Sequence, residues 1–276
     1  MSGQVVVGVD GSQSGRAAVE AAAQEAERSG VELRLAHAFA WPSAHVPRGV
    51  PPWDQGGSGA GRVAKGALAE AEGWAHRAAP QVRVTHEVLM GSPVAVLESQ
   101  CREASLLVVG SRLPGRTGAL RPGSVAGQLA SHGRTPVLVV RGRPDPTGPV
   151  VLAGGHAQEA RAAAEFAYAE ASARGADLVV LDRATAWNGR SHNGISDVLS
   201  VLSEKYPDVT MHRARVRARI RGGLCRALVE VSTRAQLVVV GSRNRGRLAG
   251  ALPSPVSRAA LRHADCPVAV IRAEEE

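Results

Sequence analysis

The sequence predicts an α/β protein made of two tandem doubly wound parallel-sheet domains of the Rossmann-like type. Short apolar runs at 106–109 (LLVV) and 237–240 (LVVV) have the continuous hydrophobicity of strands buried on both faces of a parallel sheet. Ala-rich segments of helical length separate such runs, so strands and helices alternate. The stretch VVGSRLPGRTG at 108–118 recurs as VVGSRNRGRLA at 239–249, which indicates an internal duplication.

The duplication predicts the domain boundaries. Gly110 aligns with Gly241 at an offset of 131 residues, whereas near the start of each half the offset is taken as 144, with Val6 on Val150. The difference, 144 − 131 = 13 residues, predicts a longer loop in the first half, and the Pro- and Gly-rich segment 41–61 is its expected place. A Pro/Gly string at 142–149 is typical of a linker. We therefore expect domains at 1–143 and 148–276.

Each half is expected to contain five strands and four helices in alternation. The first-half strands are predicted at 4–9, 32–39, 82–89, 105–110 and 136–141, and the helices at 14–29, 61–79, 93–104 and 123–132. The second-half strands are predicted at 149–153, 176–182, 209–220, 236–241 and 267–272, and the helices at 157–174, 194–205, 222–234 and 255–264.

Composition narrows the class of protein. The net charge is +8, which favours phosphate-bearing ligands in general and is not specific for nucleic acid. No apolar run approaches the length of a membrane span, and no secretory leader is recognisable, so a cytoplasmic protein without membrane contact is expected. The three cysteines (Cys101, Cys225, Cys266) are far apart, which predicts neither a metal site nor a disulfide framework.

The candidate site lies where strands one and four end. Ligands of open parallel sheets bind beyond the carboxyl ends of the strands, where the strand order reverses. Asp10 follows strand one, and its carboxylate could accept hydrogen bonds from ribose or hold a phosphate-bound metal; helix capping by Asp10 or Ser12 is the alternative. The glycine-rich loop from Gly110 leads to Ser124 at a helix N-terminus, which suits a phosphate.

These residues resemble the universal stress protein family. That family has an Asp after strand one and the motif G-x2-G-x9-G-[ST] after strand four, and here the motif runs from Gly110 to Gly123-Ser124. HGRTPVLVVR (132–141) and HADCPVAVIR (263–272) resemble its C-terminal signature. The resemblance covers nearly the whole chain as a tandem pair. It implies ATP, with or without Mg²⁺, bound by Asp10, Ala38, Gly110, Arg112, Leu113, Gly123, Ser124 and Val125.

The sequence departs from the motif in both halves. Leu113 replaces the second glycine, which lowers the expected affinity if that position needs a positive φ or close phosphate approach. In the second half the carboxylate is absent, Asn244 takes the second glycine place and Ser254-Pro255 replaces Gly123-Ser124. We therefore expect a nucleotide-binding regulatory stress protein whose second domain is a degenerate site.

Two other functions stay open at this point. One is a nucleotide-independent interaction protein of the same fold. The other, less favoured, is an ATP-using enzyme of the nucleotidyl transferase or pyrophosphatase type, since neither an HxGH, an SGGxDS nor a P-loop lysine motif is present. No catalytic residue is assigned, and slow ATP hydrolysis stays compatible with the pattern.

Two features bear on partners. The last strands of the halves, 136–141 and 267–272, are expected to pair within the chain as a pseudo-dimer; a homodimer or a protein partner is compatible with this pattern.

Residues 213–221 alternate arginine with smaller residues on a predicted edge strand. A charged edge that blocks aggregation is one interpretation, and a docking face for an acidic partner or nucleic acid is the other. The 131-residue offset aligns these arginines with valines of the first half, so either the strand face is flipped or the alignment slips by one residue.

Overall fold

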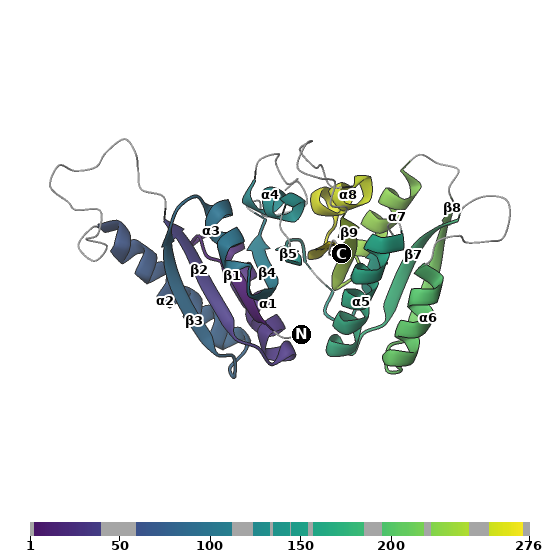
Figure 1. Ribbon diagram of the computed structural model, residues 1–276, viewed down its shortest axis with the longest axis horizontal. Helices are drawn as coiled ribbons and strands as arrows, with labels where there is room; N and C mark the ends of the chain where they lie inside the picture. Colours follow the sequence, from purple (N-terminus) through teal and green to yellow (C-terminus); the bar gives the residue numbers. More distant parts are fainter. Residues whose placement is uncertain are drawn as a thin grey trace. The chain divides into compact units, whose positions relative to one another are not determined.

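The computed structural model describes two compact units, Met1–Arg112 and Leu113–Glu276. The described residues are 3–39, 59–111, 124–132, 135–143, 145–153, 157–184, 195–217, 222–242 and 254–272. Both units are α/β, with helices flanking a sheet of mostly parallel strands (Figure 1). The units differ from the sequence repeats: the fourth helix and the fifth strand of the first repeat follow Leu113 and therefore belong to the second unit. The domain boundary between 143 and 148 stays a prediction about the duplication.

The first unit contains a four-stranded parallel sheet in the order β3-β2-β1-β4. Its central strand β1 includes Val5, Val6 and Val7, which are at most 2% exposed because strands and helices cover both of their faces. The elements are β1 Gln4–Gly8, α1 Gln13–Ser29, β2 Leu33–Phe39, α2 Gly59–Ala78, β3 Val84–Met90, α3 Pro93–Gln100 and β4 Ala104–Gly110.

Side-chain contacts show which helices cover which face of this sheet. Arg34 of β2 donates to Gln100 of α3 at 3.1 Å, so this face lies under α3. Thr85 is the register partner of Arg34, and the next residue, His86, lies against Glu72 of α2. Because successive strand residues point to opposite faces, α2 and α3 lie on opposite sides of the sheet.

The second unit contains six strands in the order β5-β10-β9-β6-β7-β8. All neighbouring pairs are parallel except β5 and β10, which pair antiparallel with Val268 opposite Val139. This confirms the expected intrachain pairing of the two last strands. The elements are α4 Val125–His132, β5 Val137–Val140, β6 Val150–Ala153, α5 Ala157–Arg174, β7 Leu178–Ala184, α6 Ile195–Lys205, β8 Met211–Arg217, α7 Gly223–Ser232, β9 Leu237–Ser242, α8 Pro255–His263 and β10 Val268–Arg272.

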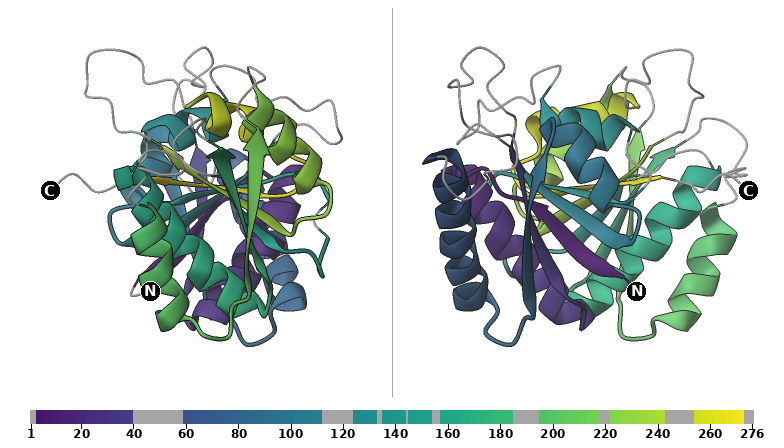
Figure 2. Two further views of the ribbon diagram at one scale, coloured as in Figure 1. Left: turned by 90° about the vertical axis from the view of Figure 1, so that its right-hand side faces the viewer. Right: turned by 60° about the vertical axis from the view of Figure 1, so that its left-hand side comes forward.

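Helices also cover both faces of this second sheet. The hydroxyl of Tyr168 in α5 donates to the carbonyl of Leu199 in α6 at 3.4 Å, which joins these two helices on one face. Cys225 of α7 contacts the carbonyl of Pro255 in α8, which joins the other pair. Figure 2 shows the strands between these two helical layers. The sheet is therefore buried between them, as the apolar runs predicted.

Strand registers correct the predicted alignment of the repeats. Val5 pairs with Leu33 and Leu106, and Val150 pairs with Leu178 and Leu237. Val5 therefore corresponds to Val150, an offset of 150 − 5 = 145, so the predicted 144 was wrong by one residue. The caps agree, because Gly30 and Gly175, also 145 apart, both have a positive φ at a helix end (64° and 59°). At β4 and β9 the offset is 237 − 106 = 131, as predicted.

Two arginines join the helices of one repeat to the last strand of the other. Arg141, after β5, donates from Nη1 to the carbonyl of Ala260 at 3.2 Å and to that of Leu261, and from Nη2 to that of Arg262 at 3.1 Å. Arg272 in β10 donates to the carbonyl of Ala130 in α4 at 3.4 Å. These carbonyls end helices α8 and α4, where cations are favoured.

Helix and strand ends differ from the predictions by small amounts. The helix predicted at 93–104 ends at Gln100, because the Cys101 N–H caps the carbonyls of Leu97 and Glu98 and the chain then turns into β4. The strand predicted at 209–220 is described over Met211–Arg217.

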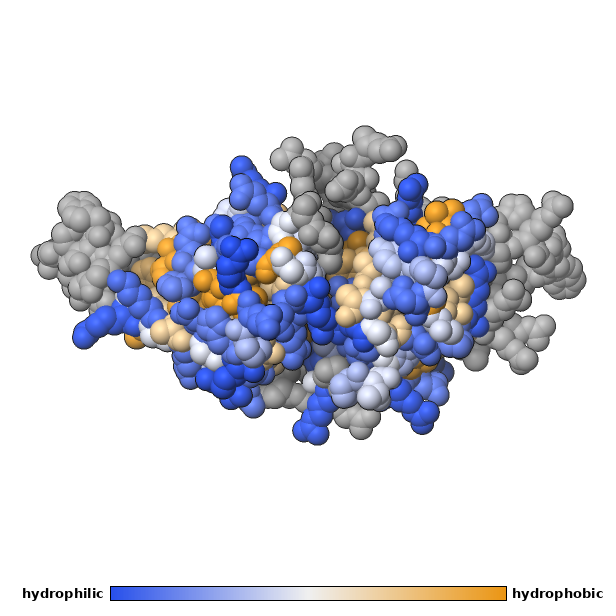
Figure 3. Space-filling model, turned by 90° about the horizontal axis from the view of Figure 1, so that it is seen from below, coloured by the Kyte–Doolittle hydropathy of each residue, from blue (hydrophilic) through white to orange (hydrophobic). Residues whose placement is uncertain are grey.

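No helix in the described part of the chain combines the length and apolar character needed to cross a membrane. On the side of each unit drawn in Figure 3, hydrophilic residues prevail over smaller hydrophobic areas.

Candidate functional site

The loop after β1 holds Asp10 in a fixed turn. The Asp10 Oδ1 atom accepts hydrogen bonds from the Ser12 backbone N–H at 3.0 Å and from the Ser12 hydroxyl at 2.6 Å. The Ser12 Oγ atom in turn accepts from the Gly15 N–H at 3.0 Å. Ser12 is therefore the N-cap of α1, and Asp10 orients the cap. This resolves the capping alternative: Ser12 caps the helix, while the exposed Asp10 lies two residues before the cap.

A glycine in the first turn of α1 leaves room for the Asp10 carboxylate. A Cβ atom on Gly15 would lie 2.5 Å from the Asp10 Oδ1 atom, closer than van der Waals contact allows. Gly15 is buried and has an ordinary helical φ, so space rather than backbone conformation selects glycine here. The sequence analysis missed Gly15; the signal that could have found it is a glycine five residues after Asp10 at a predicted helix start.

The end of β4 approaches the same helix start. A Cβ atom on Gly110 would lie 2.4 Å from the Ser14 backbone oxygen, so a larger residue cannot occupy this position without moving α1 or β4. Ser111, the next residue, is buried. Because β1 lies between β2 and β4, the carboxyl ends of β1 and β4 meet at the point where the strand order reverses. The structure therefore brings Asp10 and Gly110 together at α1.

The end of β2 lies on the other side of the β1 terminus. The His37 Nδ1 atom lies 2.8 Å from the Val9 carbonyl oxygen, so in the neutral ring Nδ1 carries the proton and donates it. The bond therefore connects β2 to the last residue before Asp10, which is a structural role for His37. Ala38, the next residue, is half-buried and continues the β2–β3 pairing opposite Leu89.

The remaining candidate residues belong to the second unit or lie outside the described residues. The Ser124 Oγ atom accepts from the Gly127 N–H at 3.1 Å, so Ser124 caps α4, and Val125 is its first residue. Arg112, Leu113 and Gly123 lie outside the described residues. The structure thus groups Asp10, Ala38 and Gly110 in the first unit, and places Ser124 and Val125 at the start of α4 in the second.

At the corresponding helix start in the second repeat, the serine hydroxyls form hydrogen bonds with backbone groups of the same repeat. Pro255 opens α8 as predicted, and Ser254 caps it by accepting from the Ser257 N–H at 3.1 Å. The fully buried Ser257 hydroxyl donates to the Gly241 carbonyl at 2.9 Å. With the 145-residue offset, the counterpart of Asp10 is Gly155, one residue beyond the expected Gly154. The carboxylate is therefore absent from the second repeat under either alignment.

Within the residues that the structure describes, no group of three His, Cys, Asp or Glu side chains could hold a metal ion by itself. None of the three cysteines forms a disulfide. Burial raises the pKa of the Cys266 thiol to about 12, so this cysteine is neutral in its apolar surroundings. None of the three cysteines lies in the Asp10–Gly110 site. The described groups of this site that could contact a ligand are backbone polar atoms, serine hydroxyls and the Asp10 carboxylate.

Comparisons with known proteins show which family the chain resembles. The family model described as the universal stress protein family matches residues 1–141 and 198–272. The universal stress protein Rv2623 of Mycobacterium tuberculosis is 32% identical over 291 aligned residues, covering 97% of this chain and 96% of the relative. A second M. tuberculosis protein, universal stress protein Rv1996, is 31% identical over 314 residues, covering 99% and 96%. A solved universal stress protein from Archaeoglobus fulgidus shares the fold at 16% identity, with a TM-score of 0.74 over 100% of this chain and 98% of that one.

Proposed function

Because the chain belongs to the universal stress protein family, whose members are generally regulators rather than enzymes, we propose that it is a nucleotide-binding regulatory stress protein with one working site, in the first repeat. The ligand is ATP, with or without Mg²⁺. Asp10 contacts the ribose, the Ala38 backbone contacts adenine, and Gly110, Arg112, Leu113, Gly123, Ser124 and Val125 surround the ribose and phosphates. No residue is assigned a catalytic role.

The arrangement of Asp10 between Ser12, Gly15 and Gly110 is the observation that supports this proposal most. Ser12 occupies the Oδ1 atom of Asp10 and thereby fixes the direction of the carboxylate, which suits a group that must meet a ribose hydroxyl. Gly110 has no Cβ because the Ser14 backbone fills that position, so the end of β4 lies directly against the helix start beside Asp10. A single carboxylate also fits Mg²⁺ that is carried on phosphates, since such ions usually take one or two protein carboxylates.

The second repeat supports a single site per chain. Its counterpart of Asp10 is a glycine, and proline at the first position of α8 has no N–H to offer a phosphate. The Ser257 hydroxyl is already bonded to the Gly241 carbonyl. This repeat keeps the strands and helices but lacks the carboxylate and the helix-start N–H at these two positions.

Calorimetric titration of the nucleotide-stripped full-length protein with Mg-ATP tests the proposal. We expect one site per chain, lost in the D10A/S124A double variant and retained in a D197A/S196A control that alters an exposed Asp and a nearby Ser of α6. Two sites per chain would contradict the degenerate second repeat. No binding at millimolar ATP would contradict the nucleotide function and favour the interaction-protein alternative, which Leu113 keeps open.

A further inference from the structure

Strand β8 forms one outer edge of the second unit's sheet and carries arginine at every second position. It pairs with β7 and ends the strand order, so its outer N–H and C=O groups have no neighbouring strand among the described residues. Arg213, Arg215 and Arg217 alternate with His212, Ala214 and Val216. Alternate residues share one face of a strand, so the three arginines fall on one face, about 7 Å apart from one to the next.

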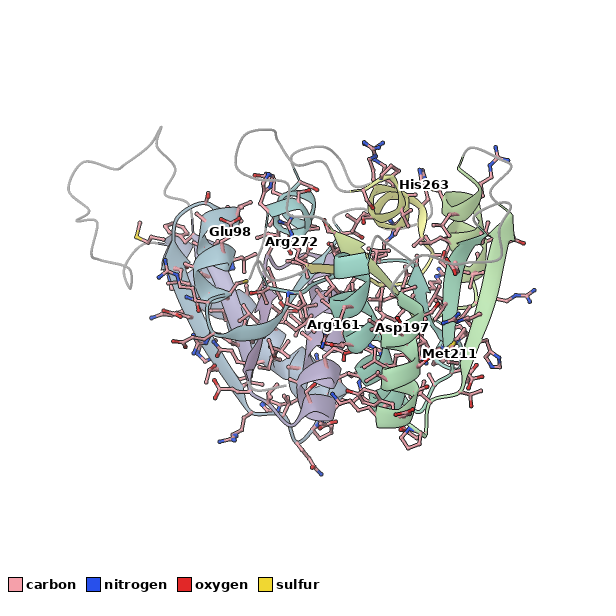
Figure 4. The ribbon with its side chains drawn as sticks, turned by 45° about the vertical axis from the view of Figure 1, so that its right-hand side comes forward. Glu98, Arg161, Asp197, Met211, His263 and Arg272 are labelled. Atoms are coloured by element: carbon pink, nitrogen blue, oxygen red, sulfur yellow. The ribbon has the colours of Figure 1, made fainter. Side chains whose placement is uncertain are left out.

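The charges around these positions leave this edge basic. Arg213 is exposed and makes no ion pair with the described residues. Burial raises the pKa of the Tyr168 hydroxyl in α5, and the positive charge of Arg213 partly opposes this effect. Asp182 of β7 is the register partner of Arg215 and supplies one opposing carboxylate. On the other face, His212 lies 3.4 Å from Asp177. Figure 4 labels Met211 at the start of this strand.

The fold itself does not require arginine at these positions, as the first repeat shows. Leu33 pairs with Val84, and Leu178, its counterpart, pairs with Met211, so the offset between β3 and β8 is 211 − 84 = 127 residues. The offset between β3 and β8 is therefore four residues smaller than the 131 found at β4 and β9, rather than one residue smaller. Because four is an even number, the arginines and their counterparts lie on the same face of the strand. The counterparts of the three arginines are His86, Val88 and Met90. Strand β3 is also an edge of its sheet, so protection of an edge does not by itself explain the arginines.

We propose that the β8 edge binds an extended acidic segment of a partner protein, which adds to the sheet as a further strand. An added strand satisfies the outer backbone groups of β8 through main-chain hydrogen bonds. Its side chains on one face also repeat about every 7 Å, so Asp or Glu at every second position meets the three arginines in register. Strand β8 has no Phe, Tyr or Trp on which successive bases could stack, which favours a peptide over single-stranded nucleic acid.

Fluorescence anisotropy with labelled peptides and the full-length protein tests this proposal. We expect a peptide that alternates Glu with Thr to bind, and a peptide of the same composition with its Glu residues contiguous to bind at least about threefold more weakly, since only alternation matches the arginines. N-methylation of alternate peptide bonds on the pairing side should remove binding, because the added strand loses its donors. The R213Q/R215Q/R217Q variant should bind about tenfold more weakly.

The matched control is R161Q/R226Q/R234Q, which makes the same change of charge at exposed arginines elsewhere in the second unit. It should change affinity less than about twofold if the edge is the site. Equal loss in both variants, equal binding of the two peptides, tighter binding of oligouridine, or no peptide binding at low ionic strength would each overturn the proposal. Thermal melting of both variants shows that any loss does not come from unfolding. The result is independent of whether ATP binds.

Discussion

Arg141 and Arg272 are equivalent residues, 131 positions apart, and each donates to carbonyls that end a helix of the other repeat. The two contacts are unequal. Arg141 is 8% exposed and contacts three successive carbonyls of α8, whereas Arg272 makes one longer bond to Ala130. Burial lowers the pKa of both guanidinium groups, and for Arg141 the carboxylate of Asp265 opposes this effect. Of these two arginines, Arg141 therefore makes most of the hydrogen bonds between the repeats.

We expect Arg141→Ala to lower the free energy of unfolding by about 2–4 kcal/mol, because it removes the guanidinium donors from the carbonyls of Leu261 and Arg262, while Ala260 keeps the Ala264 N–H. Arg272→Ala should cost about 1 kcal/mol or less, since one long hydrogen bond is lost. Urea unfolding of the two variants, followed by circular dichroism, gives both values. Equal losses would show that the three bonds of Arg141 are not stronger than the one bond of Arg272.

Gly15→Ala should weaken ATP binding about tenfold with little loss of stability, because the new Cβ atom displaces the Asp10 carboxylate from its turn. Calorimetric titration beside thermal melting checks both parts. Gly66→Ala in α2 is the matched control, since it is also a helical glycine, with nothing within 4 Å of the new Cβ. Unchanged affinity in Gly15→Ala would mean that the position of Asp10 does not matter for binding.

Gly110→Ala should destabilise the first unit by about 2 kcal/mol or more, because the Cβ atom would meet backbone at Ser14, which cannot rotate away as a side chain can. Gly8→Ala provides the comparison, since its Cβ would meet only the flexible end of Leu97, at 3.0 Å. Chemical denaturation should therefore rank Gly110→Ala as the more harmful. The reverse order would show that β4 and α1 can separate at low cost.

Alkaline pH should destabilise the protein through Cys266. The folded thiol has a pKa of about 12, above the unfolded value near 8.5, so the unfolded state loses its proton first as pH rises. The stability that the neutral thiol provides is complete below about pH 8.5 and is lost between that value and pH 12, by about 1.4 kcal/mol per pH unit.

Urea unfolding at pH 8 and pH 10 measures this loss in the wild type and in Cys266→Ala. The variant should lose less stability between the two pH values, although its stability at pH 8 is lower because it lacks a buried sulfur. Parallel losses in both proteins would assign the alkaline sensitivity to other groups. Cys101→Ala, at a half-buried position, should behave like the wild type.

The strands and the pairing of the two last strands could be predicted, because apolar runs are a local property of the sequence and the repeat makes those two strands equivalent. That the end of β1 binds a ligand stays a prediction. The exact alignment of the repeats could not be predicted. Val5, Val6 and Val7 form a uniform run, so the sequence alone does not show which of them corresponds to Val150. The strand pairings with Leu33 and Leu178 identify Val5 as the counterpart. The role of Gly15 was also hidden, since it depends on where the Asp10 side chain turns.

The antiparallel pairing of β5 with β10 joins two equivalent strands that lie in one chain. In an assembly of two identical chains, every substitution at such a contact appears twice, and the contact weakens as the protein is diluted. Here each position can change without its counterpart, and the pairing is independent of concentration. One repeat can therefore keep a carboxylate at Asp10 while the other acquires arginines along β8, so that a duplicated fold comes to carry two different surfaces.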